Sequence, residues 1–367
     1  MATLLSLERY LPPYRYDQEV VTRWVRQWLE EDLPPKDGPP YGGGPAGASS
    51  RLISVYASSG VRTRASVVPI EEVFRPGDFE TQNRRYREIA CQAGSDVARR
   101  AVQEAGLEPA DIEFVVSVSC TGFMIPAVDA HVANALGMGP RLARLPITES
   151  GCAGGVVGLS RAADYLAAHP AGAALLLALE FSSLTFQRWD RSATNVVSSA
   201  IFGDGGAAAV LVGPHHPAAA RGLVRVKDGG SLFFPDTTHL MGFELRNQGL
   251  QILLDKGLAP FVRREIGPAV DAFLAPRGIA RSDIRRWILH PGGRRIIEVM
   301  SERLGLAPSD LAPTERVLAE HGNMSSVTVL FVLDEILRTG RPPAGALGLL
   351  GAFGPGFAAE LALVEFA

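Results

Sequence analysis

The stretch GLEPADIEFVVSVSCTG at residues 106–122 has a counterpart later in the chain, GIARSDIRRWILHPGG at residues 278–293. In both stretches an aspartate, Asp111 or Asp283, stands directly before an apolar run with the length of a buried strand. A turn containing glycine follows each run. The two aspartates are 172 positions apart. This match indicates that the chain contains one structural unit twice.

Two further pairs of stretches support the duplication. SGCAGGVVGLSRAADYL around Cys152 resembles HGNMSSVTVLFVLDEIL around Asn323, 171 positions later. FGDGGAAAVLVG from Phe202 resembles FGPGFAAELALV from Phe353 at an offset of 151, which fits an insertion of about 20 residues near 182–201. We therefore predict two similar halves, residues 1–213 and residues 214–367, meeting near 213–225 and related by a pseudo-twofold axis.

Helix and strand patterns alternate along the chain and predict an α/β fold. Apolar runs predict strands at 112–119 and 174–181, and a helix of about 20 residues from position 83 precedes the first of them. Asp17 stands where it could cap an amphipathic helix. Residues 34–50 are rich in Gly and Pro and predict a loop, whose role the sequence leaves open. The long uncharged stretch at 342–359 is broken by Gly and Pro, so it predicts two short strands rather than a membrane span.

The composition excludes several classes of protein. The 367 residues are 47% hydrophobic and 20% charged, as expected of a globular protein with a large core. A net charge of -3 gives no electrostatic support for binding nucleic acid or acidic membranes. Three cysteines do not form a disulfide framework, and the N-terminus lacks the basic region of a signal peptide. We expect a cytoplasmic protein without integral membrane association.

Three residues on converging elements form a candidate catalytic set. Cys152 precedes a run of helical periodicity, where the helix dipole favours a thiolate. His290 closes the apolar run RWILH, at the strand end where α/β proteins form their active sites. Asn323 heads a segment too apolar for a surface helix. The duplication brings these elements together at the centre of the molecule, so the three residues together indicate a catalytic site far more specifically than any one of them.

The chain resembles a type III polyketide synthase of the chalcone synthase-like family. The supporting segments are GCAGG at 151–155, FGDGGAAA at 202–209, WILHPGG at 287–293, HGNMSS at 321–326 and GAFGPG at 351–356. The resemblance implies the thiolase fold, with two duplicated βαβαβ-type halves in a layered αβαβα arrangement. It implies a homodimer that condenses malonyl-CoA units iteratively onto an acyl-CoA starter. It also places the family's catalytic Cys, His and Asn at Cys152, His290 and Asn323.

The residues suit that chemistry. An imidazolium at His290 would hold Cys152 as the thiolate that takes the acyl group from CoA. Loss of CO2 from malonyl-CoA leaves an enolate, and His290 and Asn323 could donate to its oxygen. Decarboxylation makes the carbanion without a carboxylate base, and we identify no such base in the sequence. No metal-ligand spacing is present, so we expect neither a metal nor a cofactor.

The resemblance also indicates pocket and CoA-binding residues. Phe202 matches a gatekeeping Phe between the CoA tunnel and the cavity, and Ile252 stands where the family usually has a second gatekeeping Phe, which should widen the passage for an aliphatic starter. Further pocket positions are Thr185, Ser325 and Thr121, with Ile125 expected to reach into the partner's cavity. Basic residues near the tunnel mouth that could meet CoA phosphates are Arg51, Arg62 and Arg64.

Several alternatives stay open at this point. A ketoacyl carrier-protein synthase of type III shares the fold and the Cys, His and Asn set. A papain-like cysteine protease has the same residue order, but Asn323 lies 171 residues after Cys152, beyond the spacing of that family. The pocket residues favour a fatty acyl starter and a pyrone or resorcinol-type product. The starter, the number of extensions and the mode of cyclisation depend on a cavity shape that the sequence does not define.

Overall fold

A computed structural model describes residues 1–31, 49–75 and 77–367. Most of the loop expected at 34–50 lies outside the described residues, and positions 49 and 50 begin helix α2 instead. The helices are α1 (Gln18–Glu30), α2 (Ser49–Ser58), α3 (Ile70–Val73), α4 (Phe79–Glu104), α5 (Val128–Leu136), α6 (Gly154–Ala168), α7 (Ala193–Ile201), α8 (Leu258–Leu274), α9 (Arg294–Leu304), α10 (Pro308–His321) and α11 (Thr328–Gly340). The strands are β1 (Ala2–Tyr10), β2 (Tyr14–Asp17), β3 (Thr63–Ser66), β4 (Ile112–Val118), β5 (Ala143–Ile147), β6 (Ala173–Phe181), β7 (Asp204–Val212), β8 (Val224–Phe233), β9 (Met241–Arg246), β10 (Gly249–Leu254), β11 (Ile284–Leu289), β12 (Leu347–Gly354) and β13 (Ala358–Phe366).

The strand order displays the duplication. In the part of the chain that the structure describes, nine strands form one sheet in the order β11-β12-β13-β8-β1-β7-β6-β4-β5. The same pattern occurs on either side of the β8–β1 pair. In the first half, β6 pairs antiparallel with β7 and parallel with β4. In the second half, β12 pairs antiparallel with β13 and parallel with β11. Asp111 and Asp283 also have the same role, since each accepts a 2.8 Å hydrogen bond from the backbone N–H three residues earlier. The expected pair of similar halves is therefore confirmed, while the boundary at 213 stays a prediction.

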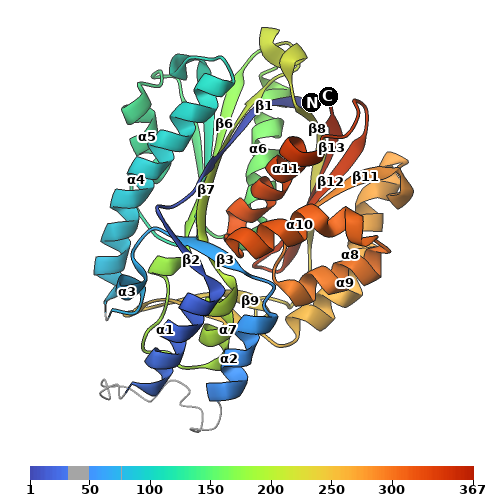
Figure 1. The fold of residues 1–367 in the computed structure, drawn as a ribbon. Coiled ribbons are helices and arrows are strands. Elements are labelled where there is room, and N and C mark those ends of the chain that lie inside the picture. The colour runs from blue at the N-terminus through green and yellow to red at the C-terminus, as the bar shows by residue number, and fades with distance from the viewer. Residues whose placement is uncertain (32–48, 76) are drawn as a thin grey trace.

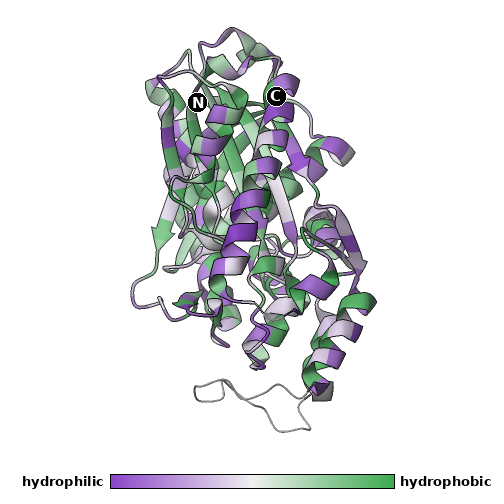
Figure 2. Ribbon diagram, turned by 90° about the vertical axis from the view of Figure 1, so that its left-hand side faces the viewer, coloured by the Kyte–Doolittle hydropathy of each residue, from purple (hydrophilic) through white to green (hydrophobic). Residues whose placement is uncertain are grey.

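Both faces of the sheet are covered, which explains its uninterrupted apolar strands. In β6, Ala174, Leu176 and Ala178 pack into the central cluster with α6 and α11, and the alternate leucines pack against α4. Helices α8 and α9 cover the outer face of the second half (Figure 1). Figure 2 shows hydrophobic residues concentrated along the strands and the inner helices. The layers agree with the α/β, thiolase-like arrangement predicted from the sequence.

Glycine allows the two central helices to begin side by side. A Cβ atom on Gly155 in α6 would lie 2.3 Å from the carbonyl oxygen of Ser326, directly before α11. A Cβ atom on Gly154 would lie 2.4 Å from Val118 at the end of β4. Because only glycine fits at both positions, the segments that carry Cys152 and Asn323 meet at the centre of the molecule.

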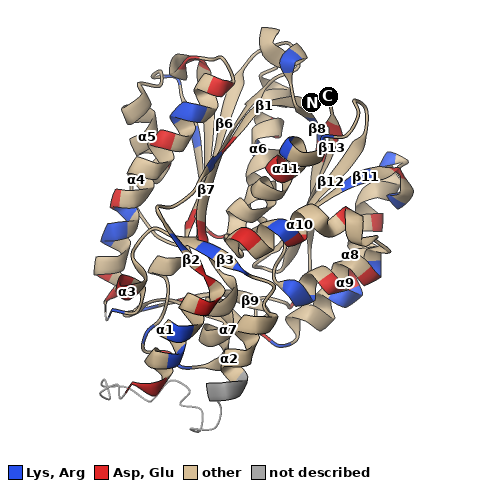
Figure 3. Cartoon of the chain, viewed as in Figure 1, with Lys and Arg blue, Asp and Glu red and all other residues tan. Residues whose placement is uncertain are grey.

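The surface has mixed charge. In the view of Figure 3, Lys and Arg lie interspersed with Asp and Glu over the outer helices. Many of these side chains form exposed ion pairs, such as Arg294 with Glu298 in α9. None of the described helices is long and apolar enough to span a bilayer.

Candidate active site

Cys152 lies in a single 3-10 turn, Gly151–Ala153, that leads into α6. Gly151 has a φ of +48° and packs against Pro355 of the β12–β13 turn, where a Cβ atom would lie 2.7 Å from the proline ring. This turn places the cysteine in the wall of a cavity. The thiol is buried and faces the cavity, so a substrate entering the cavity can reach it.

Asn323 is fixed by its backbone and its side chain. Its N–H donates to Ile201 at 2.9 Å, and its carbonyl oxygen accepts from Gly203 at 3.0 Å, so it bridges to the end of α7. Its side-chain Oδ1 accepts a 2.8 Å bond from the Ser325 N–H. The amide NH2 of Asn323 therefore remains available as a hydrogen-bond donor. The side chains of Asn323 and Ser325 both lie within hydrogen-bonding reach of Cys152.

His290 directly follows β11, and its backbone N–H donates to Gly351 of β12 at 2.9 Å. The imidazole is buried, and neither ring nitrogen has a hydrogen-bond partner among the described residues. A buried histidine normally has both nitrogens satisfied. Both ring nitrogens are therefore available to a group that the described residues do not supply.

Burial disfavours the charged form of both Cys152 and His290. It raises the pKa of the Cys152 thiol to about 11 and lowers the pKa of His290 to about 3, since charged forms lose their hydration in the interior. Burial alone thus opposes the thiolate–imidazolium pair expected from the sequence. The ion pair can form only if both charges appear together and stabilise each other.

A buried carboxylate close to Cys152 and Cys120 was not predicted from the sequence. Glu180, at the end of β6, is fully buried, and burial raises its pKa. It accepts hydrogen bonds from Thr121 at 2.9 Å and from Ser326 at 2.6 Å, and the N–H of Cys120 donates to it at 3.0 Å. The signal was a single acidic residue closing the apolar run ALLLALEF. Cys120, which lies 3.4 Å from Ser325 through its sulfur, was also not identified as a cavity residue.

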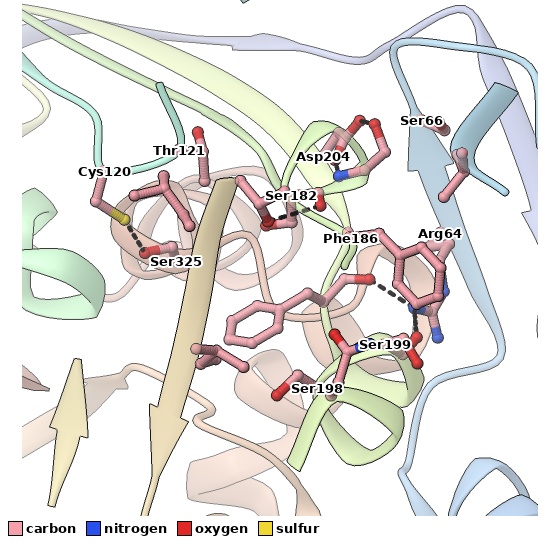
Figure 4. Close-up of a pocket in the computed structure, with 18 of the residues that line it drawn as sticks. Arg64, Ser66, Cys120, Thr121, Ser182, Phe186, Ser198, Ser199, Asp204 and Ser325 are labelled. Carbon is pink, nitrogen blue, oxygen red and sulfur yellow. Dashed lines mark hydrogen bonds between the residues drawn. The ribbon is translucent and has the colours of Figure 1, made fainter. Parts of the chain in front are cut away.

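Five residues predicted for the pocket line this cavity: Thr121, Thr185, Phe202, Ile252 and Ser325. Most of the wall is apolar, with serines and threonines at intervals, and Figure 4 shows Cys120, Thr121, Phe186 and Ser198 around it. Phe243 of β9 also lines the cavity and was not predicted. Ile125 does not line it and is 99% exposed, so its predicted place in a partner's cavity stays a prediction.

The three arginines predicted to bind CoA differ in their surroundings. Arg62 has a side chain that is 72% exposed and lies 3.8 Å from Glu320. Arg64 is buried, and its guanidinium donates to the carbonyl oxygens of Ser199, Ala200 and Phe202 at 2.6–2.7 Å (Figure 4). The prediction that Arg64 meets CoA phosphates does not fit this arrangement, because the guanidinium is buried and both of its terminal nitrogens already donate inside the protein. The side chain of Arg51 lies outside the described residues.

Comparison with known proteins gives the family. The model of the chalcone and stilbene synthase N-terminal domain matches residues 80–216, and that of the C-terminal domain matches residues 226–366. A 1,3,6,8-tetrahydroxynaphthalene synthase of Streptomyces peucetius subsp. caesius is 36% identical over 99% of this chain and 93% of its own length. The chain belongs to the chalcone and stilbene synthase family. It is thus a type III polyketide synthase, an acyltransferase that catalyses decarboxylative Claisen condensation.

Two further relatives agree with this assignment. A putative chalcone synthase of Bacillus subtilis strain 168 is 32% identical over 100% of this chain and 99% of its own length. The crystal structure of 1,3,6,8-tetrahydroxynaphthalene synthase from Streptomyces coelicolor A3(2), a bacterial type III polyketide synthase, matches with a TM-score of 0.90 and 32% identity over 99% of both chains. The papain-like alternative is therefore wrong.

Proposed function

We propose that this type III polyketide synthase extends an aliphatic acyl-CoA starter with malonyl-CoA units and closes the product to a pyrone or a resorcinol-type ring. The observation that carries the proposal is the position of Cys152 in the wall of a largely apolar cavity. An alkyl chain gains about 0.8 kcal/mol for each CH2 that it buries against such walls. The cavity thus favours a starter with an apolar tail.

The site residues divide the reaction between them. In starter loading, His290 takes the thiol proton of Cys152 as the sulfur attacks the acyl-CoA carbonyl, and CoA leaves. Malonyl-CoA then loses CO2, and the negative charge that develops on its thioester oxygen needs donors. His290 Nε2–H and the Asn323 amide supply them. The enolate carbon attacks the acyl carbonyl on Cys152, the C–S bond to Cys152 breaks to release the thiolate, and the extended chain remains on the CoA that carried the malonyl unit.

A panel of starters tests the proposal. The enzyme receives malonyl-CoA with acetyl-, butyryl-, decanoyl-, palmitoyl- or benzoyl-CoA, and mass spectrometry identifies the products. Alkyl pyrones or resorcinols formed at higher kcat/KM from the longer aliphatic starters support it. A preference for benzoyl-CoA, or a strict need for a carrier protein as in ketoacyl synthase III, contradicts it.

The relatives favour a second candidate. Tetrahydroxynaphthalene, the product named for two of them, carries no alkyl chain. Its ten ring carbons with hydroxyls at alternate positions correspond to a chain of five two-carbon units. An enzyme of this kind would form product from malonyl-CoA alone, without any other starter. A reaction with malonyl-CoA and no other starter, run beside the panel, separates the two candidates.

Three other expectations belong to this proposal. The exposed edge strand β5 and the neighbouring Phe123 and Ile125 support a homodimer, because an uncovered strand edge with apolar side chains is suited to pairing with a second copy. The chemistry needs no metal or redox cofactor, so activity should survive chelation. Location in the cytoplasm stays a prediction from the cysteine content.

A further inference from the structure

A second, smaller pocket lies directly beside the active-site cavity. Thr121, Thr185 and Phe186 line both spaces, so the two are separated by little more than the width of a side chain. Figure 4 shows Thr121 and Phe186 in the wall of the active-site cavity. We call the second space the Arg188 pocket, after an arginine in its wall. A group bound in the Arg188 pocket therefore lies close to a chain in the active-site cavity.

The wall of the Arg188 pocket is polar and carries positive charge. Two arginines, Arg75 and Arg188, line it, and so do amide side chains, among them those of Gln82 and Gln187. None of the described residues that line it is an aspartate or a glutamate. The active-site cavity differs, because its lining is mostly apolar. A pocket with positive charge and no carboxylate in its wall is suited to an anion rather than to an alkyl chain.

Arg188 has donors available for such an anion. Its side chain is only 14% exposed, and its Nη2 donates to Glu31 at 2.5 Å. Its carbonyl oxygen accepts a 2.8 Å bond from the indole of Trp28, so the residue is held against the end of α1. Its Nε and Nη1 atoms are buried and have no hydrogen-bond partner among the described residues. Because buried donors are normally paired, these nitrogens indicate a group that the described residues do not supply.

We propose that the Arg188 pocket binds a carboxylate group. Arginine pairs with carboxylates through charge-assisted hydrogen bonds, which are stronger than bonds between neutral groups. The carboxylate can come from two sources, the far end of a dicarboxylic acyl chain on Cys152 or a free carboxylate in solution. A malonyl group on Cys152, as in the second candidate function, is the shortest chain of the first kind. For this source the inference rests on the proposed function in one respect, that Cys152 holds the acyl chain.

Matched pairs of acyl-CoA test the first source. Succinyl-, glutaryl-, adipyl- and suberyl-CoA are compared with butyryl-, valeryl-, hexanoyl- and octanoyl-CoA, which have a methyl group in place of the distal carboxylate. Mass spectrometry follows acylation of Cys152, and the ratio of the two rates is taken within each pair. We expect Arg188→Met to lower this ratio about tenfold for the chain length that reaches the pocket. Arg188→Lys should lower it less, because lysine keeps the charge but not the forked donors.

Titration with sodium glutarate tests the second source and needs no acyl-CoA. The ionic strength is held constant with sodium chloride, and the change in Tm is measured. A ligand that binds only the folded protein raises Tm, and at about ten times its Kd the rise should be about 2 °C for a chain of this length. We expect this rise in the wild type and not in R188M. The comparison uses the change in Tm, so any loss of stability in R188M itself does not affect it.

Arg191→Met is the matched control. Arg191 also donates to the end of α1, through the carbonyl oxygen of Trp28 at 3.0 Å, but it lines neither the Arg188 pocket nor the active-site cavity. It should change neither the acylation ratio nor the effect of glutarate. A lowered ratio in R188M supports the acyl chain as the source, and a lost glutarate effect supports a free carboxylate.

Two results would overturn the proposal. R188M could equal the wild type in both measurements, or R191M could show the same losses as R188M, which would reveal a structural role alone. Failure of every acyl-CoA to acylate Cys152 contradicts the proposed function instead. The glutarate titration then decides whether the Arg188 pocket binds a carboxylate.

Discussion

Arg64 is predicted to hold the end of α7, and with it Phe202, in place. Its guanidinium is buried and donates to three backbone carbonyl oxygens in this region, at Ser199, Ala200 and Phe202, and to the side chain of Gln18 in α1. Arg64→Met keeps a long apolar side chain but removes every donor. Three buried acceptors then lose their partner, because the carbonyl oxygen of Ala200 still accepts from Gln18 Nε2 at 2.9 Å.

The size of the effect follows from these contacts. A buried acceptor without a donor costs about 1–3 kcal/mol, so three acceptors cost at least about 3 kcal/mol. Burial of the cation offsets part of this, since it lowers the pKa of Arg64 from 12.5 to about 10, equivalent to about 3 kcal/mol. At about 2 kcal/mol for each acceptor, the net loss is about 3 kcal/mol. With an unfolding entropy of about 2 cal/mol/K per residue, Tm should fall by about 4 °C.

Differential scanning calorimetry of the dilute protein measures this change. Arg62→Met is the control, because Arg62 is an exposed arginine two residues away whose ion pair should contribute less than about 1 kcal/mol. We expect its Tm to stay within about 1 °C of wild type. An R64M protein as stable as R62M, with a raised KM for malonyl-CoA, would refute the structural role and favour CoA binding instead.

Three further predictions concern packing and protonation. Gly155→Ala should destabilise the protein by at least about 3 kcal/mol in urea unfolding, because its Cβ would lie 2.3 Å from a carbonyl oxygen, whereas Gly340→Ala in open space should not destabilise it. His290→Gln removes the cation that could stabilise the thiolate, so the pH midpoint of Cys152 alkylation should rise toward about 11; equal midpoints in both proteins would exclude an ion pair. Burial raises the pKa of Asp204 from 3.8 to about 6, so the folded state binds more protons and stability falls by about 3 kcal/mol as pH rises from 4 to above 6. The Asp204→Asn variant should not lose stability over this pH range. The same loss in both proteins would show that Asp204 is not the group responsible.

The sequence predicted those features that depend on local pattern. Strands appeared as apolar runs, and the runs at 112–119 and 174–181 correspond to β4 and β6. Cys152 and Asn323 were identified because short motifs surround them and because the duplication relates their segments. Gly154 and Gly155 also indicate that these two segments meet, because only glycine leaves room for the contact.

The features it missed depend on contacts between distant segments. Arg64 and Arg62 are indistinguishable in sequence, yet one is buried against α7 and the other is exposed. Phe243 lines the cavity because of the register in which β9 pairs with β10. A shift of one residue would turn its side chain to the other face of the hairpin. The opposing pKa shifts of Cys152 and His290 follow from burial, which a sequence motif does not quantify.

The central claim is that Cys152 carries the acyl group while Asn323 stabilises the enolate. Its most direct test compares two rates in Asn323→Ala, the release of CO2 from malonyl-CoA and the acylation of Cys152 by the starter. We expect CO2 release to fall about 100-fold or more, because one oxyanion donor is lost, and acylation to fall far less. Equal loss of both rates would contradict the account.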